Sequence, residues 1–77
     1  MSGNARLTPR EKEILGYIMA GKSNREIARE LNLSMSTVKA HLSSIYQKLG
    51  VSNRTQAGLV GFRILPLLGG VARAAES

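Results

Sequence analysis

Apolar residues recur at helical spacing in four successive segments, and none shows the two-residue alternation of a strand. The first segment begins at Thr8. Pro9 suits the first helical position, and Glu11 completes a capping-box pattern with Thr8. Gly21 is expected to end this helix in a left-handed conformation. The predicted buried face consists of Ile14, Leu15, Ile18 and Met19.

A shorter second helix is predicted from a second capping box, formed by Ser23 and Glu26. Asn32 lies in the tight connection that follows, where a positive φ is expected, because asparagine tolerates that conformation. The buried face predicted for this helix consists of Ile27, Ala28 and Leu31.

The third predicted helix is the longest, capped by Ser34 or Ser36 and ending at Leu49 before Gly50. Its apolar sector contains Val38, Leu42, Ile45 and Leu49. The opposite face is small and polar, with Lys39 at its boundary, and no acidic residue occurs between Met35 and Leu49. That face contains Ser36, Ala40, Ser43, Ser44 and Gln47.

The fourth helix is predicted from about Arg54 to Ile64, with Pro66 stopping it. One apolar side contains Ala57, Val60 and Ile64. A second contains Thr55, Leu59 and Phe62, which a monomer does not need and a symmetric partner would cover. Gly58 and Gly61 either permit close helix approach or tolerate fraying.

The 77 residues are sufficient for a single domain, and 43% of them are hydrophobic. We expect an all-α domain over residues 7–65, a flexible segment over 1–6 and a frayed tail over 66–77. The chain contains no cysteine, so no disulfide is expected to stabilise it.

The net charge of +6 favours a polyanionic partner, although a merely soluble basic surface is an alternative. The polar start shows no signal peptide. Leu59 to Leu68 is too short to cross a bilayer and contains Arg63 and Pro66. We therefore expect a cytoplasmic protein that has no membrane partner.

No residue pattern indicates catalysis, a metal site or a cofactor. His41 is the only histidine and has no acidic neighbour on its helix face, so packing or a phosphate contact is more plausible than metal binding. Glu11 and Glu13 are expected to bond to Arg54 or Arg10 rather than to act as acid–base groups. We therefore expect a protein that is not an enzyme.

A short helix, a tight turn and a longer helix form the unit that places its second helix in the DNA major groove. The groove admits one helix. Close approach requires small side chains, which Ser36, Ala40 and Ser43 provide. Lys39 is long enough to reach base acceptors or a phosphate.

Several segments together closely resemble the LuxR-type helix-turn-helix family, which includes GerE and the output domains of NarL- and FixJ-like response regulators. The resemblance covers about Leu7 to Ile64 and is carried by Leu7-Thr8-Pro9-Arg10-Glu11, Ser23-Asn24-Arg25-Glu26-Ile27-Ala28, Ser36-Thr37-Val38-Lys39-Ala40-His41, Lys48-Leu49-Gly50-Val51 and Asn53-Arg54-Thr55-Gln56-Ala57.

This resemblance implies a four-helix bacterial domain in which the third helix recognises DNA and the fourth forms a homodimer. The implied function is sequence-specific binding of double-stranded DNA that regulates transcription, by a stand-alone regulator or by the output domain of a response regulator. The implied base contacts are Ser36, Lys39, Ala40 and Ser43. The implied DNA-backbone contacts are Thr37, Lys48, Ser23 and Asn24, and the implied dimer interface is Thr55, Gly58, Leu59 and Phe62.

Two alternatives remain open. A promoter-recognition module of a sigma factor shares the Leu-Thr-Pro-Arg-Glu opening and would act within RNA polymerase, although the capped fourth helix after Leu49 is not typical of it. RNA polymerase also stays an open partner for a LuxR-type regulator. The other alternative is a basic helical module that binds proteins.

Overall fold

The computed structural model describes residues 6–68, which form four α-helices and no strand. The helices are α1 (Pro9–Met19), α2 (Asn24–Leu31), α3 (Met35–Leu49) and α4 (Arg54–Leu68). The all-α prediction is therefore confirmed. Apart from Arg6 and the helical residues 66–68, the expected flexible start and frayed tail lie outside the described residues.

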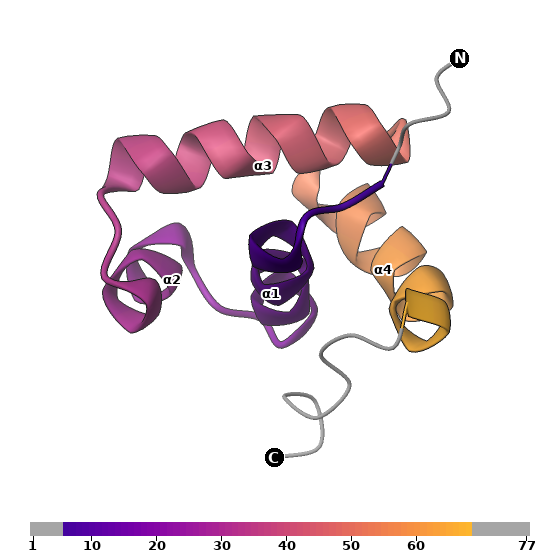
Figure 1. Ribbon diagram of the computed structural model, residues 1–77, viewed down its shortest axis with the longest axis horizontal. Coiled ribbons are helices and arrows are strands. Elements are labelled where there is room, and N and C mark those ends of the chain that lie inside the picture. The colour runs from indigo at the N-terminus through magenta and orange to yellow at the C-terminus, as the bar shows by residue number, and fades with distance from the viewer. Residues whose placement is uncertain (1–5, 69–77) are drawn as a thin grey trace.

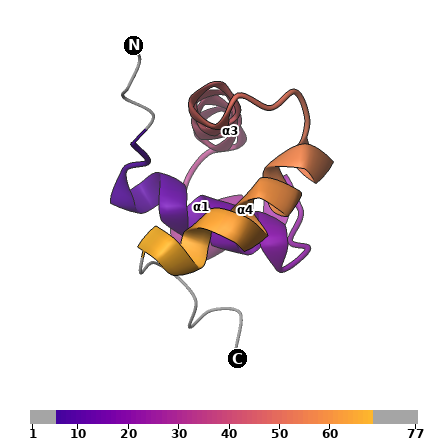
Figure 2. The same ribbon diagram turned by 90° about the vertical axis from the view of Figure 1, so that its right-hand side faces the viewer.

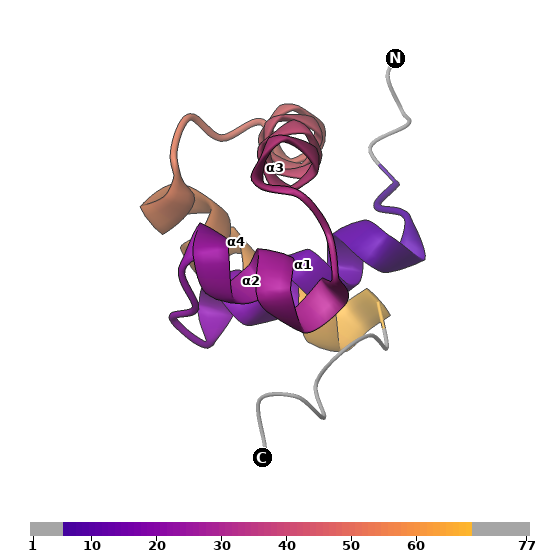
Figure 3. The ribbon, with the colours of Figure 1, turned by 90° about the vertical axis from the view of Figure 1, so that its left-hand side faces the viewer.

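Helix α3 lies along one side of the molecule, across the other three helices (Figure 1). Viewed from either end, it stands above α1, α2 and α4, and no other described helix covers its outer side (Figures 2 and 3). The fold therefore leaves one long face of α3 open.

Local hydrogen bonds begin the first three helices where the capping patterns predict. Reciprocal capping boxes join Thr8 to Glu11 and Ser23 to Glu26. For α3, where the sequence left two candidates, the cap is Ser34, whose Oγ accepts from the Thr37 amide at 3.1 Å. These side chains satisfy amides that the first turn of a helix leaves without a backbone partner.

The same three helices end in left-handed residues, as expected for Gly21 (φ 83°) and Asn32 (φ 57°), and Gly50 (φ 69°) adopts this conformation after α3. After α2, the Leu33 amide donates to the Ala28 carbonyl at 2.8 Å, which closes the turn and directs the chain into α3. The connection between α2 and α3 is therefore defined by local geometry.

The core is aliphatic and draws on every helix. The fully buried side chains come from α1, α2 and α3, and α4 adds two more at its inner side. The most buried residues are Ile14, Leu15, Ile27, Val38, Ile45, Ala57 and Leu65. Burial of these side chains provides the main free energy that holds α3 in place.

The predicted end of α4 was wrong, because the helix continues through Pro66 to Leu68. Proline within the last turn removes only one helical hydrogen bond. The preceding residue, Leu65, is 2% exposed, so its burial holds the helix against the core.

The inner side of α4 also differs from the prediction. Val60 and Ile64 are only half-buried, whereas Gly61 and Leu65 are buried beside Ala57. A Cβ atom at Gly61 would lie 2.8 Å from Met19 Sδ and 3.2 Å from Leu15. Gly61 therefore permits close approach of α4 to α1.

Candidate nucleic-acid interface

The outer side of α3 presents a small polar surface, which we call the groove face: Ser36, Lys39, Ala40, Ser43 and Gln47. All five residues are exposed. Counted from Ser36, they occupy positions i, i+3, i+4, i+7 and i+11, which share one side of a helix. Lys39 carries the only charge on this face, and its neighbours are short enough to let the helix approach a surface closely.

Met35 extends this surface and was not identified from the sequence. It is the first residue of α3 and is 40% exposed, one helical turn before Lys39. Its exposure could have been predicted from its position directly after the Ser34 cap, because Met35 lies outside the apolar sector of this helix.

Hydroxyl groups stand at the starts of the two helices of the helix-turn-helix unit. Ser23 Oγ accepts from the Glu26 amide at 3.1 Å. Ser34 Oγ donates to Thr37 Oγ1 at 2.9 Å. Because Ser23 and Thr37 only accept in these contacts, each keeps a hydroxyl hydrogen to donate elsewhere.

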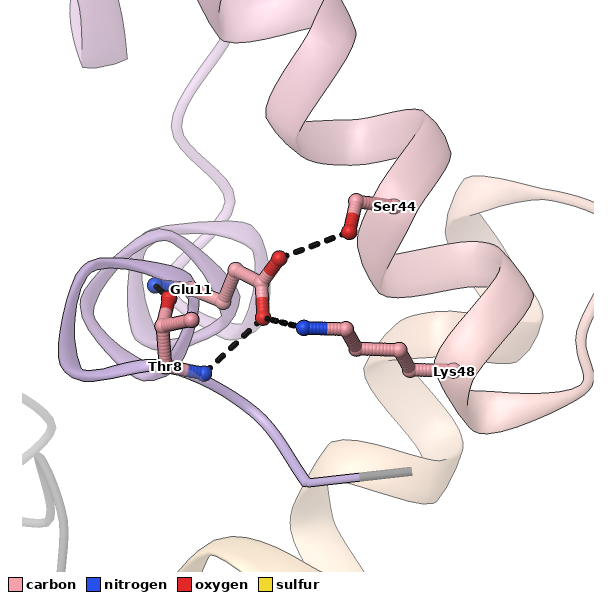
Figure 4. A network of polar contacts seen from close by, with 4 residues as sticks. All are labelled: Thr8, Glu11, Ser44 and Lys48. Carbon is pink, nitrogen blue, oxygen red and sulfur yellow. Dashed lines mark hydrogen bonds and ion pairs between the residues drawn. The ribbon is translucent and has the colours of Figure 1, made fainter. Parts of the chain in front are cut away.

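A buried polar network joins the start of α1 to the last two turns of α3 (Figure 4). Glu11 is only 4% exposed. Its Oε1 accepts from the Thr8 amide at 2.9 Å and from Lys48 Nζ at 2.8 Å, while its Oε2 accepts from Ser44 Oγ at 2.7 Å. The network fixes α3 relative to α1.

Burial alone would raise the pKa of Glu11, because a low-dielectric environment disfavours the carboxylate. Hydrogen bonds from Lys48, Thr8 and Ser44, together with the charge of Lys48, outweigh burial and lower this pKa from 4.5 to about 2. Glu11 is therefore ionised at neutral pH and remains paired with Lys48.

This network corrects two sequence-based expectations. Ser44 does not belong to the outer polar face, because it points toward α1 and bonds to Glu11. Glu11 bonds to Lys48 instead of Arg54 or Arg10, whereas the expected pairing of Glu13 with Arg10 is present at 3.3 Å. The Lys48 ammonium, expected at a DNA phosphate, is engaged inside the molecule here.

Arg54, at the start of α4, bridges to the start of α2. Its Nη1 donates to Asn24 Oδ1 at 2.8 Å, and its Nη2 donates to the carbonyl of Lys22. No local pattern indicates this contact, since Arg54 lies 30 residues from Asn24 and 32 from Lys22. The bridge joins the fourth helix to the helix-turn-helix unit.

The outer side of α4 carries the apolar patch expected from the sequence: Thr55, Gly58, Leu59 and Phe62. Leu59 is 64% exposed and Phe62 is 62% exposed. A shallow pocket lies between this patch and α1, and it is lined also by Ile18, Met19 and Arg54. The exposure of this side is confirmed, whereas its role as a dimer interface stays a prediction.

Charge is distributed unevenly over residues 6–68. All four acidic residues in that range lie on α1 and α2, whereas α3 and α4 carry Lys39, Lys48, Arg54 and Arg63 and no acid.

The described residues contain no cluster of acidic or histidine side chains that could hold a metal ion. No helix in that part of the chain is long and apolar enough to cross a membrane.

The sequence profile of the family described as "Bacterial regulatory proteins, luxR family" matches residues 5–60. This match covers all of α1, α2 and α3 and the first part of α4. It supports the LuxR-type resemblance over the sigma-factor alternative.

Two relatives are much longer than the chain. YhjB of Escherichia coli (strain K12), whose name describes an HTH-type transcriptional regulator, is 56% identical over 54 residues, which cover 70% of this chain and 27% of YhjB. The HTH-type transcriptional regulator MalT of Yersinia pestis (strain Pestoides F) is 45% identical over 63 residues, or 82% of this chain and 7% of MalT. The chain thus corresponds to a small part of each.

Proposed function

This chain belongs to the luxR family of bacterial regulatory proteins, and from that premise we propose that it binds double-stranded DNA sequence-specifically, as a dimer, to regulate transcription. The observation that carries the proposal is the groove face, because it combines exposure, small side chains and the absence of acidic residues on a helix whose outer side is covered by no other described helix. Such a helix fits the major groove.

Base contacts in this proposal come from Ser36, Lys39, Ala40 and Ser43. Lys39 donates to guanine acceptors, and Ala40 contacts a thymine methyl group. The serine hydroxyls bond to base edges directly or through water. Since only one of these side chains is long, DNA shape and the spacing of two half-sites also contribute to specificity.

Contacts to the DNA backbone come from the helix starts. The free hydroxyl hydrogens of Ser23 and Thr37 are suited to phosphate oxygens. Asn24 contributes an amide. Lys48 reaches a phosphate only if its ammonium leaves Glu11 or is shared with it, because the two groups are 2.8 Å apart.

The dimer forms through the apolar patch of α4. Leu59 and Phe62 together expose a large apolar surface for so small a domain, and burying it against the same patch of a second copy removes that surface from water. Two groove faces related by a two-fold axis then bind repeated half-sites.

Selection of bound duplexes from a random library tests this proposal, because it yields the sequence, symmetry and half-site spacing together. We expect an enriched motif with two repeated half-sites. Affinity for the selected duplex should fall steeply as salt rises, because phosphate contacts release counterions. Absence of an enriched motif and of salt-dependent duplex binding would refute the proposal and favour a protein-binding module.

A further inference from the structure

The Arg54 guanidinium donates hydrogen bonds to the residues before and after Ser23, which is the cap of α2. Nη1 donates to the Asn24 side chain, and Nη2 donates to the Lys22 carbonyl. A planar guanidinium presents its donors in a fixed fork, so binding both oxygens sets the orientation of the Asn24 amide.

This contact determines which end of the amide is occupied. A guanidinium carries donors only, so its partner on Asn24 must be Oδ1. The Nδ2 group is attached to the same carbon and is therefore directed away from Arg54. Within the described part of the chain, Nδ2 makes no hydrogen bond and no buried side-chain nitrogen or oxygen lacks a partner, so Nδ2 is not fully buried. An amide held in this way has its oxygen turned toward Arg54 and offers two N–H donors, and donors are what a phosphate oxygen requires.

The charges around the amide also favour an anion. Both acceptors of Arg54 are neutral, so its positive charge is not cancelled. Among the described residues, the ion pairs are Arg10–Glu13 and Lys48–Glu11, and neither includes Arg54. Lys22 and Arg25 add positive charge next to Ser23 and Asn24 in the sequence, and with Arg54 they outnumber the one acid nearby, Glu26, whose carboxylate accepts from the Ser23 amide at 2.8 Å.

We propose that Arg54 is a positioning residue for DNA binding, which holds Asn24 with its Nδ2 donors toward a DNA phosphate. This inference rests on the proposed function. It gives α4 a role in DNA binding besides its proposed role in dimer formation, because Arg54, the first residue of α4, orients a DNA contact on α2. It requires the forked shape of the guanidinium, whereas a purely electrostatic role of Arg54 would require only its charge.

The substitution Arg54→Lys separates shape from charge in the 77-residue chain. Lysine keeps the charge but cannot bond to both oxygens in the same geometry. We expect affinity for the selected duplex to fall about tenfold, corrected for the folded fraction, because a hydrogen bond to a charged group is lost. The slope of affinity against salt should not change, because no cation is removed.

A double-mutant cycle tests whether Arg54 acts through Asn24. Asn24→Ala should weaken binding to a similar degree, and Arg54→Lys should add little to it. The matched control pair is Arg54→Lys with Lys39→Ala, whose effects should be additive. A merely structural role of Arg54 would give the same coupling with both partners, which would overturn the proposal.

Asn24→Asp provides a second measurement should Arg54→Lys fail to fold. An aspartate still accepts from Arg54, so folding is retained, but it has no donor and repels phosphate. Its duplex affinity should be lower than that of Asn24→Ala. Equal or higher affinity overturns the proposal, as does wild-type affinity of folded Arg54→Lys. If the unsubstituted chain binds no duplex, the proposed function itself has failed.

Discussion

The carboxylate of Glu11 serves two interactions at once, because it caps α1 through the Thr8 amide and holds α3 through Lys48 and Ser44. A buried carboxylate with these three partners is stable only while it remains ionised. The position of α3 is therefore linked to the protonation state of a residue outside that helix.

This linkage predicts loss of stability in acid. The folded-state pKa of Glu11 is about 2, below its ordinary value of 4.5, so its contribution is fully present above about pH 5 and is lost as the pH falls toward 2. The loss amounts to about 3 kcal/mol. Chemical unfolding at a series of pH values measures it.

Glu11→Gln is expected to lower the free energy of unfolding at pH 7 and to flatten its decline in acid. The matched control is Glu13→Gln, which removes a half-exposed ion pair with Arg10. Such a pair contributes at most about 1 kcal/mol. Equal effects of the two substitutions would contradict the role assigned to Glu11.

Lys39 is the one long side chain among the four proposed base contacts. We expect Lys39→Ala to weaken binding to the selected duplex by about 1–3 kcal/mol and to relax the base preference at one position of each half-site. Titration against a set of single-base variants measures both. The control Arg63→Ala, on α4, should leave the base preference unchanged; unchanged affinity of a folded Lys39→Ala protein would remove Lys39 from the interface.

At the scale of the element, α4 contains two glycines in different surroundings. A Cβ at Gly61 would meet Met19 Sδ at 2.8 Å, whereas one at Gly58 would meet only Ile18 Cγ2 at 3.9 Å. Replacing either glycine with alanine raises the helix propensity of α4, but only Gly61→Ala overpacks the contact between α4 and α1.

We therefore expect opposite effects from two chemically identical changes. Gly58→Ala should raise the free energy of unfolding by roughly 0.5–1 kcal/mol. Gly61→Ala should lower it by about 1–2 kcal/mol, since Leu15 is fully buried and cannot move aside freely. Thermal unfolding of the two variants measures the difference, and stabilisation by Gly61→Ala would show that α1 and α4 are not so closely packed.

At the scale of the whole molecule, the described part of the chain measures 33 × 27 × 20 Å. It has two separate exposed surfaces, the groove face on α3 and the apolar patch on α4. We expect Leu59→Glu to place a charge in the apolar patch and prevent pairing of two copies. Binding to a duplex with two half-sites should weaken more than binding to one half-site.

Sedimentation and duplex titration measure this effect together. Gln56→Glu is the matched control, because it adds the same charge to an exposed position on α4 outside the patch. Were Leu59→Glu to keep the association state and the two-site affinity of the unsubstituted chain, the dimer interface would lie elsewhere.

The sequence by itself determined the features that depend on neighbouring residues. The caps at Thr8 and Ser23 and the left-handed turn at Asn32 each involve atoms within a few residues. Helical periodicity likewise identified the buried side of α3 and the open groove face. These features follow from local hydrogen-bond geometry and side-chain spacing, which hold whatever the rest of the chain does.

Tertiary structure decided the features in which distant residues compete for one partner. Glu11 selects Lys48, 37 residues away, although Arg10 lies beside it, and Ser44 turns inward to join them. Gly61 proved to be a packing position, Arg54 the partner of Asn24, and Pro66 part of α4. The physical reason is that each choice depends on which groups packing of the core brings within a few ångströms, and no local pattern contains that information.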